Sequence, residues 1–222
     1  MELDTFMNLL LKPESEILDF KKEFHDNNVK LVHDILCLLN SYSEENRFLT
    51  FGVSDSKGLY GVAGDANRKN NANIQDLLRA SRVNRFPDVI MHNIIHDGKE
   101  FDILEIKNRP DKPFFLLHDK AEKGKTLRAG VVYTRLGDTN TPLGESAPED
   151  RIELMWRERF GIGMPPLDRV LRLLEDTEQW ERPSENELHH RVFPEFLTDL
   201  TRQSFENSRI AASAFVIPRM KF

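Results

Sequence analysis

The apolar positions of this chain change their spacing along its first two thirds, from a helical period to short extended runs. Residues 29–40 repeat apolar side chains along one helix face, and residues 73–85 do so more weakly. Short apolar runs bounded by turn-forming residues predict strands at 48–53, 89–95, 101–106 and 130–135. Both helices and strands are therefore expected in this part of the chain.

Shorter segments are less clearly patterned. Residues 5–12 are consistent with either a helix or a strand that ends at Pro13, and residues 14–22 favour a strand over a short helix. Residues 59–62 are expected to return as the hairpin partner of 48–53. The dipeptide Asp97-Gly98 predicts a second hairpin, which joins 89–95 to 101–106.

The pattern changes after Pro142. Residues 148–160 and 167–174 show helical spacing, whereas residues 180–222 are weakly patterned, with short extended segments expected at 194–197 and 215–218. We therefore expect a domain over 1–147 and a helical C-terminal extension over 148–222. That extension could dock a partner protein or a second copy of the chain, and the pattern of 180–222 indicates no specific role.

The composition is that of a folded, soluble protein. Of 222 residues, 39% are hydrophobic and 31% are charged, and no apolar run approaches the ~20 residues of a membrane span. The acidic start lacks a secretory pattern, and Cys37 lies in an apolar stretch, where it is expected to be a core residue. We expect a cytoplasmic protein without disulfide bonds or a membrane anchor.

The charge is distributed unevenly. The net charge of −6 argues against a general nucleic-acid coat, but residues 1–65 hold 6 Lys and Arg against 12 Asp and Glu, while 66–137 hold 14 against 9. This division fits an acidic cluster beside a phosphate-binding surface, although a mixed solvated surface would give the same counts. The candidates for nucleic-acid contact are Arg79, Arg82, Arg85, Lys107, Arg109, Lys123, Lys125 and Arg135.

The candidate chemistry lies in three acids and one lysine. Glu14 and Asp19 are five residues apart, Lys21 follows them, and Asp55 comes directly after the predicted strand 48–53. Clustered carboxylates need a divalent cation or a basic side chain, and Mg²⁺ or Mn²⁺ prefers such oxygen ligands. On a flat strand Glu14 and Asp19 would point to opposite faces, so they meet only across a bend or from a preceding turn. Surface charges with no common site are the alternative.

These residues fall in motifs that resemble the Schlafen/AlbA-like domain family. The family pattern Glu-Ser-x-x-x-Glu-Phe-Lys is similar to residues 14–21, and Gly-Val-x-Asp-x-x-Gly-x-x-Gly-Val is similar to 52–62. Asn40 at the end of the predicted helix and Tyr-x-Arg-x-Gly at 133–137 extend the resemblance over about residues 10–145. Two departures are clear: Asp19 stands where Glu is usual, and the longer turn 43–47 replaces a Gly-Gly pair.

The resemblance implies an α/β domain, with a mixed sheet and flanking helices, that binds nucleic acid. From vertebrate Schlafens it also implies metal-dependent cleavage of tRNA and rRNA. It places the catalytic and metal-binding acids on Glu14, Asp19 and Asp55, and Lys21 would stabilise phosphate charge. We therefore expect a hydrolase, a metal-dependent endoribonuclease for structured RNA, with a role in bacterial antiviral defence. The alternatives are a non-catalytic nucleic-acid-binding or regulatory module, for which DNA remains open, and a partner-binding subunit of a defence complex.

Overall fold

The computed structural model describes residues 1–175, 177–193 and 196–199. The chain divides into two compact units, Met1–Arg159 and Phe160–Phe222. The domain boundary predicted after residue 147 lies about one helix earlier in the chain than this division, because the helix Glu149–Phe160 lies between the two positions. In the described residues, no helix has both the length and the apolar character needed to cross a membrane.

A four-stranded mixed sheet forms the centre of the first unit. The strands lie in the order β1-β2-β4-β3; β1 and β2 run parallel, and the other neighbouring pairs are antiparallel. Their bounds are β1 Leu18–Lys21, β2 Arg47–Phe51, β3 Val89–His96 and β4 Lys99–Ile106. The predicted mixed α/β sheet is therefore confirmed, and β1 forms one of its edges.

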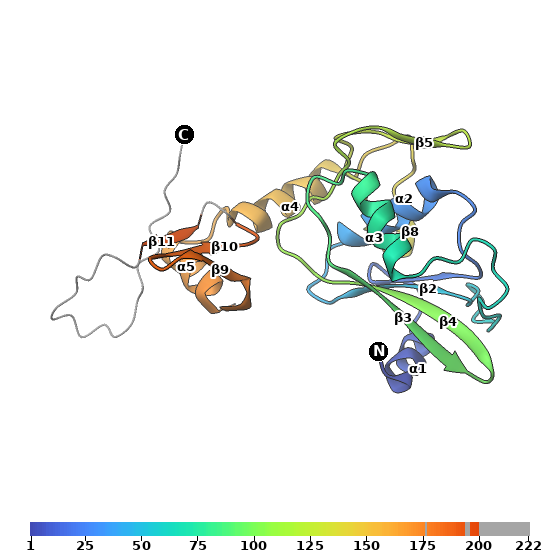
Figure 1. The fold of residues 1–222 in the computed structure, drawn as a ribbon. Helices are drawn as coiled ribbons and strands as arrows, with labels where there is room; N and C mark the ends of the chain where they lie inside the picture. Colours follow the sequence, from blue (N-terminus) through green and yellow to red (C-terminus); the bar gives the residue numbers. More distant parts are fainter. Residues whose placement is uncertain (176, 194–195, 200–222) are drawn as a thin grey trace. The chain divides into compact units, whose positions relative to one another are not determined.

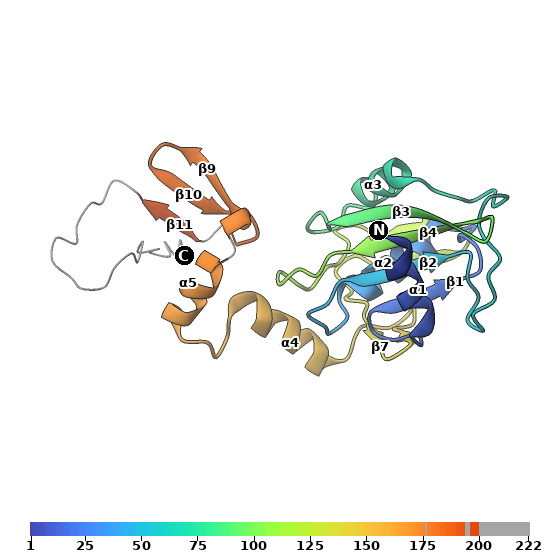
Figure 2. The ribbon, with the colours of Figure 1, turned by 90° about the horizontal axis from the view of Figure 1, so that it is seen from below.

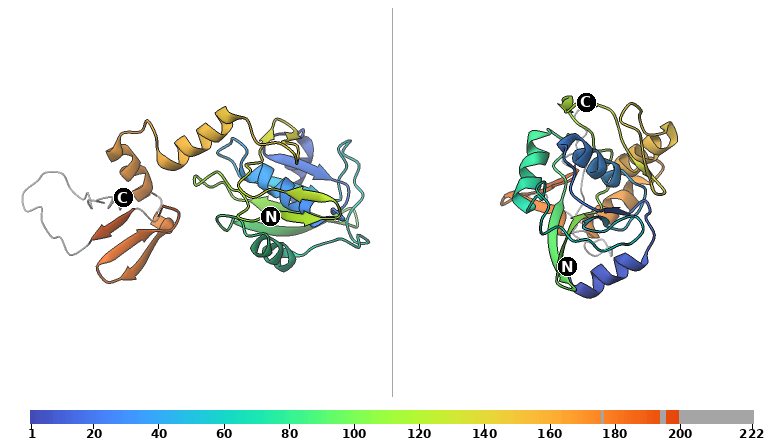
Figure 3. Two further views of the ribbon diagram at one scale, coloured as in Figure 1. Left: turned by 90° about the horizontal axis from the view of Figure 1, so that it is seen from above. Right: turned by 90° about the vertical axis from the view of Figure 1, so that its right-hand side faces the viewer.

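Helices cover both faces of this sheet (Figures 1 and 3). The helices are α1 Leu3–Leu11, α2 Asn28–Leu39 and α3 Asn71–Ala80. Leu49 and Leu104 pack in one apolar core with α2 and α3, and Phe20 and Ile103 pack in a second core with α1. Side chains alternate along each strand, so the face that receives Leu49 also receives its neighbour in the register, Asp19.

Helix α2 is buried along almost its whole length. Asn27 caps its start by accepting a hydrogen bond from the Val29 backbone N–H at 2.8 Å, and Cys37 is a fully buried core residue, as predicted. Asn40 ends the helix and is also buried. Its side-chain amide donates to the carbonyls of Phe114 and Tyr133, both at 2.8 Å, and accepts from the Phe114 N–H at 2.7 Å. Asn40 thus joins three segments that are distant in the sequence.

Gly52 and Gly61 bring the turn after β2 against the backbone of β4. Their φ angles are +95° and +77°, and a Cβ on Gly52 would lie 3.0 Å from Gly61 Cα and from the Phe101 ring. The predicted hairpin partner at residues 59–62 forms only in part. Leu59 makes a single bridge to Val53, and the Tyr60 and Gly61 N–H groups donate to the Gly52 carbonyl at 2.8 and 3.0 Å, but residues 59–62 form no regular strand. The spacing of the two glycines reflects this close approach rather than a paired strand.

Two short hairpins complete the first unit. The first consists of β5 Lys120–Glu122 and β6 Lys125–Leu127. The predicted strand at 130–135 is wrong over most of its length, since only its last residue enters the hairpin β7 Arg135–Leu136 with β8 Thr139–Asn140. Buried Tyr133 hydrogen-bonds through its hydroxyl to the Leu143 carbonyl at 3.2 Å, so burial rather than strand pairing explains this apolar run.

The C-terminal region is only partly helical, which corrects the expectation of a helical extension. It contains helices α4 Glu149–Phe160 and α5 Pro166–Glu175, the 3₁₀ turn η1 Thr177–Gln179, and the strands β9 Trp180–Ser184, β10 Glu187–His190 and β11 Leu197–Asp199. Figure 2 shows the strands as one antiparallel sheet beside α5. Because β9 is mostly exposed, its sequence carries little apolar alternation. Residues 194–195 and 215–218 lie outside the described residues.

Candidate functional site

Glu14 and Asp19 come together at the β1 edge of the sheet. Glu14 lies in the turn before β1, where Ser15 bridges to Leu18, and its Oε1 accepts a hydrogen bond from the Phe20 backbone N–H at 2.9 Å. This turn resolves the geometric problem of the sequence, because a residue outside the strand does not follow the alternation of faces. Both carboxyl groups lie within 4.0 Å of the same nitrogen, Arg135 Nη2.

Two cations hold this pair of acids. Lys21 Nζ lies 2.7 Å from Asp19 Oδ2, and Arg135 Nη2 lies 3.2 Å from Asp19 Oδ1 and 4.0 Å from Glu14 Oε2. Arg135 is fixed by a second contact, from its Nε to the Ser15 carbonyl at 2.7 Å. Asp19 Oδ2 accepts no well-directed hydrogen bond, so its contact with Lys21 is an ion pair alone. Arg135, predicted as a nucleic-acid contact, is instead a buried support of the acids.

A second set of polar residues extends the site toward α2. Arg135 Nη1 donates to Asn140 Oδ1 at 2.9 Å, and Asn140 Nδ2 donates to Asp34 Oδ1 at 2.9 Å. The other oxygen of Asp34 lies 2.6 Å from His25 Nε2. Together with Glu14, Asp19 and Lys21, these residues form a continuous polar network, which we call the Glu14 cluster: Glu14, Asp19, Lys21, His25, Asp34, Arg135 and Asn140.

The cluster has a buried layer and a layer that solvent reaches. The side chains of Asp19, Asp34 and Arg135 are 2%, 9% and 3% exposed. Those of Glu14 and Lys21 are 24% and 26% exposed. His25, at 19%, also reaches the surface. The buried groups therefore fix the positions of three side chains that a ligand could contact.

The charges of the cluster shift one another's ionisation. Burial raises the pKa of the Glu14 carboxyl above its ordinary value, and the adjoining Asp19 carboxyl acts in the same direction. Burial alone would lower the pKa of Lys21, but Asp34 and Asp19 outweigh it and the pKa is raised. Burial likewise opposes ionisation of Asp34, yet its hydrogen bond to His25 and the charge of Lys21 hold its pKa below the usual range.

Asp55 lies in the exposed turn after Val53, apart from the hydrogen bonds of the Glu14 cluster. The same turn supplies Lys57, whose ammonium lies 3.5 Å from the centre of the Phe20 ring. Burial lowers the pKa of Lys57, and Glu14 partly opposes this shift. The turn that carries Asp55 thus contributes a second accessible lysine beside Glu14.

The arrangement does not fit a metal centre made of three acids. Across the described residues, no group of three His, Cys, Asp or Glu side chains is placed to hold a metal ion. Glu14 and Asp19 could offer oxygen ligands, but Asp19 is already bound by Lys21 and Arg135. The Mg²⁺ or Mn²⁺ site therefore stays a prediction, and we derive no chemical step through it.

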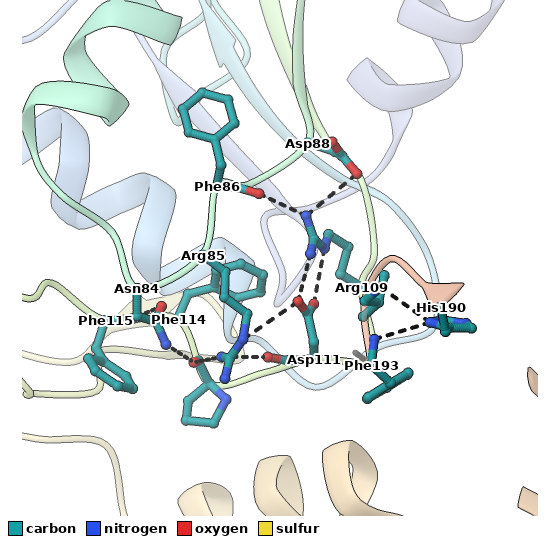
Figure 4. A network of polar contacts seen from close by, with 12 residues as sticks. Asn84, Arg85, Phe86, Asp88, Arg109, Asp111, Phe114, Phe115, His190 and Phe193 are labelled. Atoms are coloured by element: carbon teal, nitrogen blue, oxygen red, sulfur yellow. Dashed lines mark hydrogen bonds and ion pairs between the residues drawn. The ribbon is translucent and has the colours of Figure 1, made fainter. Parts of the chain in front are cut away.

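Several of the candidate nucleic-acid contacts are bound within the protein. Figure 4 shows Arg85 and Arg109 on either side of Asp111, a fully buried carboxylate. Arg109 donates to both Asp111 oxygens, at 3.0 and 2.6 Å, and to the Phe86 carbonyl at 2.7 Å. Arg85 donates to the carbonyls of Asp111 and Pro113. We call these three charged residues the Asp111 network, and its arginines stabilise the loop after β4.

The remaining basic candidates lie nearer the surface. Lys107 pairs with Glu105 at 2.6 Å, Arg79 pairs with Asp76 at 3.2 Å, and Arg82 contacts His118 at 3.2 Å. Lys123 and Lys125 are exposed at the tip of the β5–β6 hairpin. These side chains are spread over different parts of the first unit. Two of them, Lys123 and Lys125, lie together at the β5–β6 tip.

The pattern of the sequence did not single out His25, Asp34, Asn140 or Lys57. One signal was present: His33-Asp34 interrupts the apolar run of α2, and a charged residue inside a fully buried helix needs a partner. That partner, His25, lies in the loop before the helix. Nothing in the sequence pattern places Asn140 beside Asp34, because Asn140 belongs to a hairpin more than 100 residues later in the chain.

Comparisons with known proteins bear on this domain. The family model described as "Schlafen, AlbA_2" matches residues 14–144. No curated protein matches the chain significantly. Among solved structures, the crystal structure of the DIP2311 protein from Corynebacterium diphtheriae is similar, at 15% sequence identity and a TM-score of 0.38. The match covers 63% of this chain and 29% of that one, so the chain spans less than a third of that protein's length.

Proposed function

Because this chain belongs to the Schlafen AlbA_2 family, we propose that it binds nucleic acid and cleaves RNA at the Glu14 cluster. The observation that supports the proposal best is geometric: Glu14 and Asp19, five residues apart in the motif, share Arg135 at one edge of the sheet, beside Lys21. The cluster combines accessible acidic and basic groups with buried groups that hold them. Preorganised charges of this kind stabilise the charge that develops on a phosphate during cleavage.

The accessible and the buried groups of the cluster have different roles in this proposal. Lys21 and Lys57 contact the phosphate, because an ammonium has three donors and keeps some of them unused beside the ion pair of Lys21 with Asp19 and the hydrogen bond of Lys57 to the Lys12 carbonyl. Arg135 and Asp19 are positioning residues, because both are buried and bind the neighbours that reach solvent. Glu14 lies where a phosphate held by these lysines would meet a carboxyl group of raised pKa.

The test is cleavage of tRNA by the purified chain, assayed with Mn²⁺, with Mg²⁺ and with a chelator. We expect Glu14→Gln to reduce the cleavage rate about 100-fold, the size of effect seen when one stabilising group is removed from an active site. Glu23→Gln is the matched control, because Glu23 is exposed in the loop after β1. Equal rates for Glu14→Gln and the wild type would contradict the proposal.

Nucleic-acid binding without cleavage is the second candidate. It is favoured by the neutralisation of Asp19 by two cations and by the position of Asp55 in an exposed turn. In that case the chain binds RNA or DNA, its affinity falls steeply with salt, and Glu14→Gln leaves the affinity unchanged. Binding without cleavage under all three ion conditions would select this second candidate.

A further inference from the structure

The pair formed by His25 and Asp34 leaves one ring nitrogen of the histidine available. His25 Nε2 lies 2.6 Å from Asp34 Oδ2, and Asn140 donates to the other oxygen of the carboxylate at 2.9 Å. Since Asp34 is a carboxylate, Nε2 carries the proton of that hydrogen bond, which fixes the tautomer of the neutral ring. Nδ1 then has a free lone pair and no hydrogen-bond partner in the part of the chain that the structure describes.

A second histidine–carboxylate pair shows what a purely structural pair looks like here. His92 Nε2 lies 2.7 Å from Glu105, and its Nδ1 lies 3.0 Å from the amino group of Met1. Both ring nitrogens of His92 are therefore used inside the protein. His25 has a similar carboxylate contact but keeps one nitrogen free, and its side chain is 19% exposed.

The loop that carries His25 is anchored on both sides. The Phe24 backbone N–H donates to Asp65 Oδ2 at 2.6 Å. The Asn28 backbone N–H donates to Glu122 Oε2 and the Asn27 side chain donates to the Glu122 carbonyl, both at 2.9 Å. This loop therefore holds the imidazole in a fixed place, which is what proton transfer from a bound substrate requires.

The same contacts bring a basic surface to His25. Glu122 belongs to β5, so the β5–β6 hairpin packs directly on the residues that follow His25. Lys123 at the hairpin tip donates to the Asp26 carbonyl, and Lys125 beside it is exposed. A nucleic-acid backbone that binds these lysines would pass along the loop that carries His25.

From this geometry we propose that His25, oriented by Asp34, is the base that activates the 2′-hydroxyl of an RNA substrate. This inference rests on the proposed RNA cleavage and narrows it to a reaction that DNA cannot undergo. His25 Nδ1 takes the proton of the 2′-hydroxyl, and the 2′ oxygen forms a bond to the neighbouring phosphorus. The bond from phosphorus to the 5′ oxygen breaks, and that oxygen keeps the electron pair and takes a proton from water.

The products are a 2′,3′-cyclic phosphate on one fragment and a 5′-hydroxyl on the other, and the imidazolium returns its proton to water. Asp34 is a positioning residue in this scheme, because it acts on the substrate only through His25. Lys21, whose ammonium lies in the same network, offsets the charge on the phosphate oxygens as the new bond forms.

The test compares three variants of the full chain on one short end-labelled RNA. His25→Gln keeps a side-chain amide that can donate to Asp34 but cannot take up a proton, so we expect at least a 100-fold loss of cleavage with RNA affinity retained. Asp34→Asn should lower kcat at least tenfold with little change in KM. His92→Gln is the matched control and should cleave at the wild-type rate per folded molecule. Circular dichroism checks that each variant folds.

The ends of the products separate this inference from the broader proposal. We expect 2′,3′-cyclic phosphate and 5′-hydroxyl ends, and no cleavage of an RNA with a single 2′-O-methyl group at the cut site. Cleavage that survives His25→Gln, or cuts the 2′-O-methyl substrate, overturns the role of His25 and leaves the proposed function standing. A wild-type chain that cleaves no RNA overturns both.

Discussion

The Glu14 cluster and the Asp111 network both join a buried aspartate to two cations, but they differ in the polar groups that remain accessible to solvent. In the Asp111 network, Arg109 binds both carboxylate oxygens and a backbone carbonyl, and Arg85 binds two backbone carbonyls. In the Glu14 cluster, a second carboxylate and a lysine ammonium reach solvent beside the buried pair. The first arrangement stabilises a loop, and the second is equipped to bind a ligand.

The difference shows why the number of basic residues is a poor guide to a nucleic-acid surface. Arg85 and Arg109 add to the positive charge of residues 66–137, yet their donors are directed inward (Figure 4). Lys123 and Lys125 add the same charge at an exposed hairpin tip. What distinguishes them is the geometry of the donors, which only the folded chain reveals.

The largest expected effect tests the structural half of this comparison. Asp111→Asn should lower the free energy of unfolding by about 4 kcal/mol, because it leaves two partly buried arginines without their carboxylate. Urea denaturation measures the change. Asp88→Asn is the control, since Asp88 is 66% exposed at 3.7 Å from Arg109 and should cost under about 0.5 kcal/mol. A loss below about 1 kcal/mol for Asp111→Asn would mean that the network is not a structural unit.

Asn40 tests how far the Glu14 cluster depends on distant packing. Asn40→Ala leaves three buried backbone groups without their partner and should cost about 3 kcal/mol of unfolding free energy. Because Asn40 holds the segment that leads to Arg135, the variant should also lose RNA cleavage well below its melting temperature. Thermal unfolding and cleavage assays on Asn40→Ala and the exposed control Asn8→Ala check both effects. A fully stable, inactive Asn40→Ala would contradict the structural role.

Lys112 gives a pH-dependent test on the loop after β4. Its side chain is 2% exposed, and burial, aided by the charge of Arg47, lowers its pKa to about 8. Between about pH 8 and pH 10 the unfolded chain binds a proton at Lys112 that the folded chain has lost, so this residue makes stability rise with pH. We expect wild-type stability to rise by about 2 kcal/mol more than that of Lys112→Met over this interval. Parallel curves from denaturant titrations at each pH would exclude the buried lysine as the cause.

The smallest expected effect concerns the exposed hairpin. The double variant Lys123→Gln with Lys125→Gln should weaken RNA binding about 5-fold. It should also reduce the slope of log affinity against log salt concentration by about two, with the free energy of unfolding unchanged. Fluorescence anisotropy at several salt concentrations measures both quantities. Lys99→Gln, in the first position of β4, removes one charge away from this hairpin and is the control; it should leave affinity unchanged. An equal loss from Lys99→Gln would indicate non-specific attraction rather than a binding surface.

The sequence predicts the elements whose pattern is strong and local. The apolar period of α2 and the short apolar runs of β3 and β4 are local patterns, and each element appears in the structure close to its predicted range. Strands β5 and β9 have too few buried residues to leave such a pattern. The motif glycines Gly52 and Gly61 are required because the two residues approach each other closely.

The candidate site was predictable only in part. Glu14, Asp19 and Lys21 lie within eight residues, and their motif indicated a common site. Asp34, Asn140 and Arg135 join them only because α2 and the β7–β8 hairpin pack at the β1 edge, which no local pattern encodes. Arg135 was predicted at the nucleic-acid surface, but burial against Asp19 makes it a support of the acids.

The most direct test of the Glu14 cluster as the RNA site is a crystal structure of the chain with a short 2′-O-methyl RNA, which His25 cannot activate. We expect a backbone phosphate within hydrogen-bond distance of Lys21 Nζ, with the adjoining strand along Lys123 and Lys125. RNA bound along another face, with Glu14 and Lys21 in contact only with solvent, would contradict the assignment.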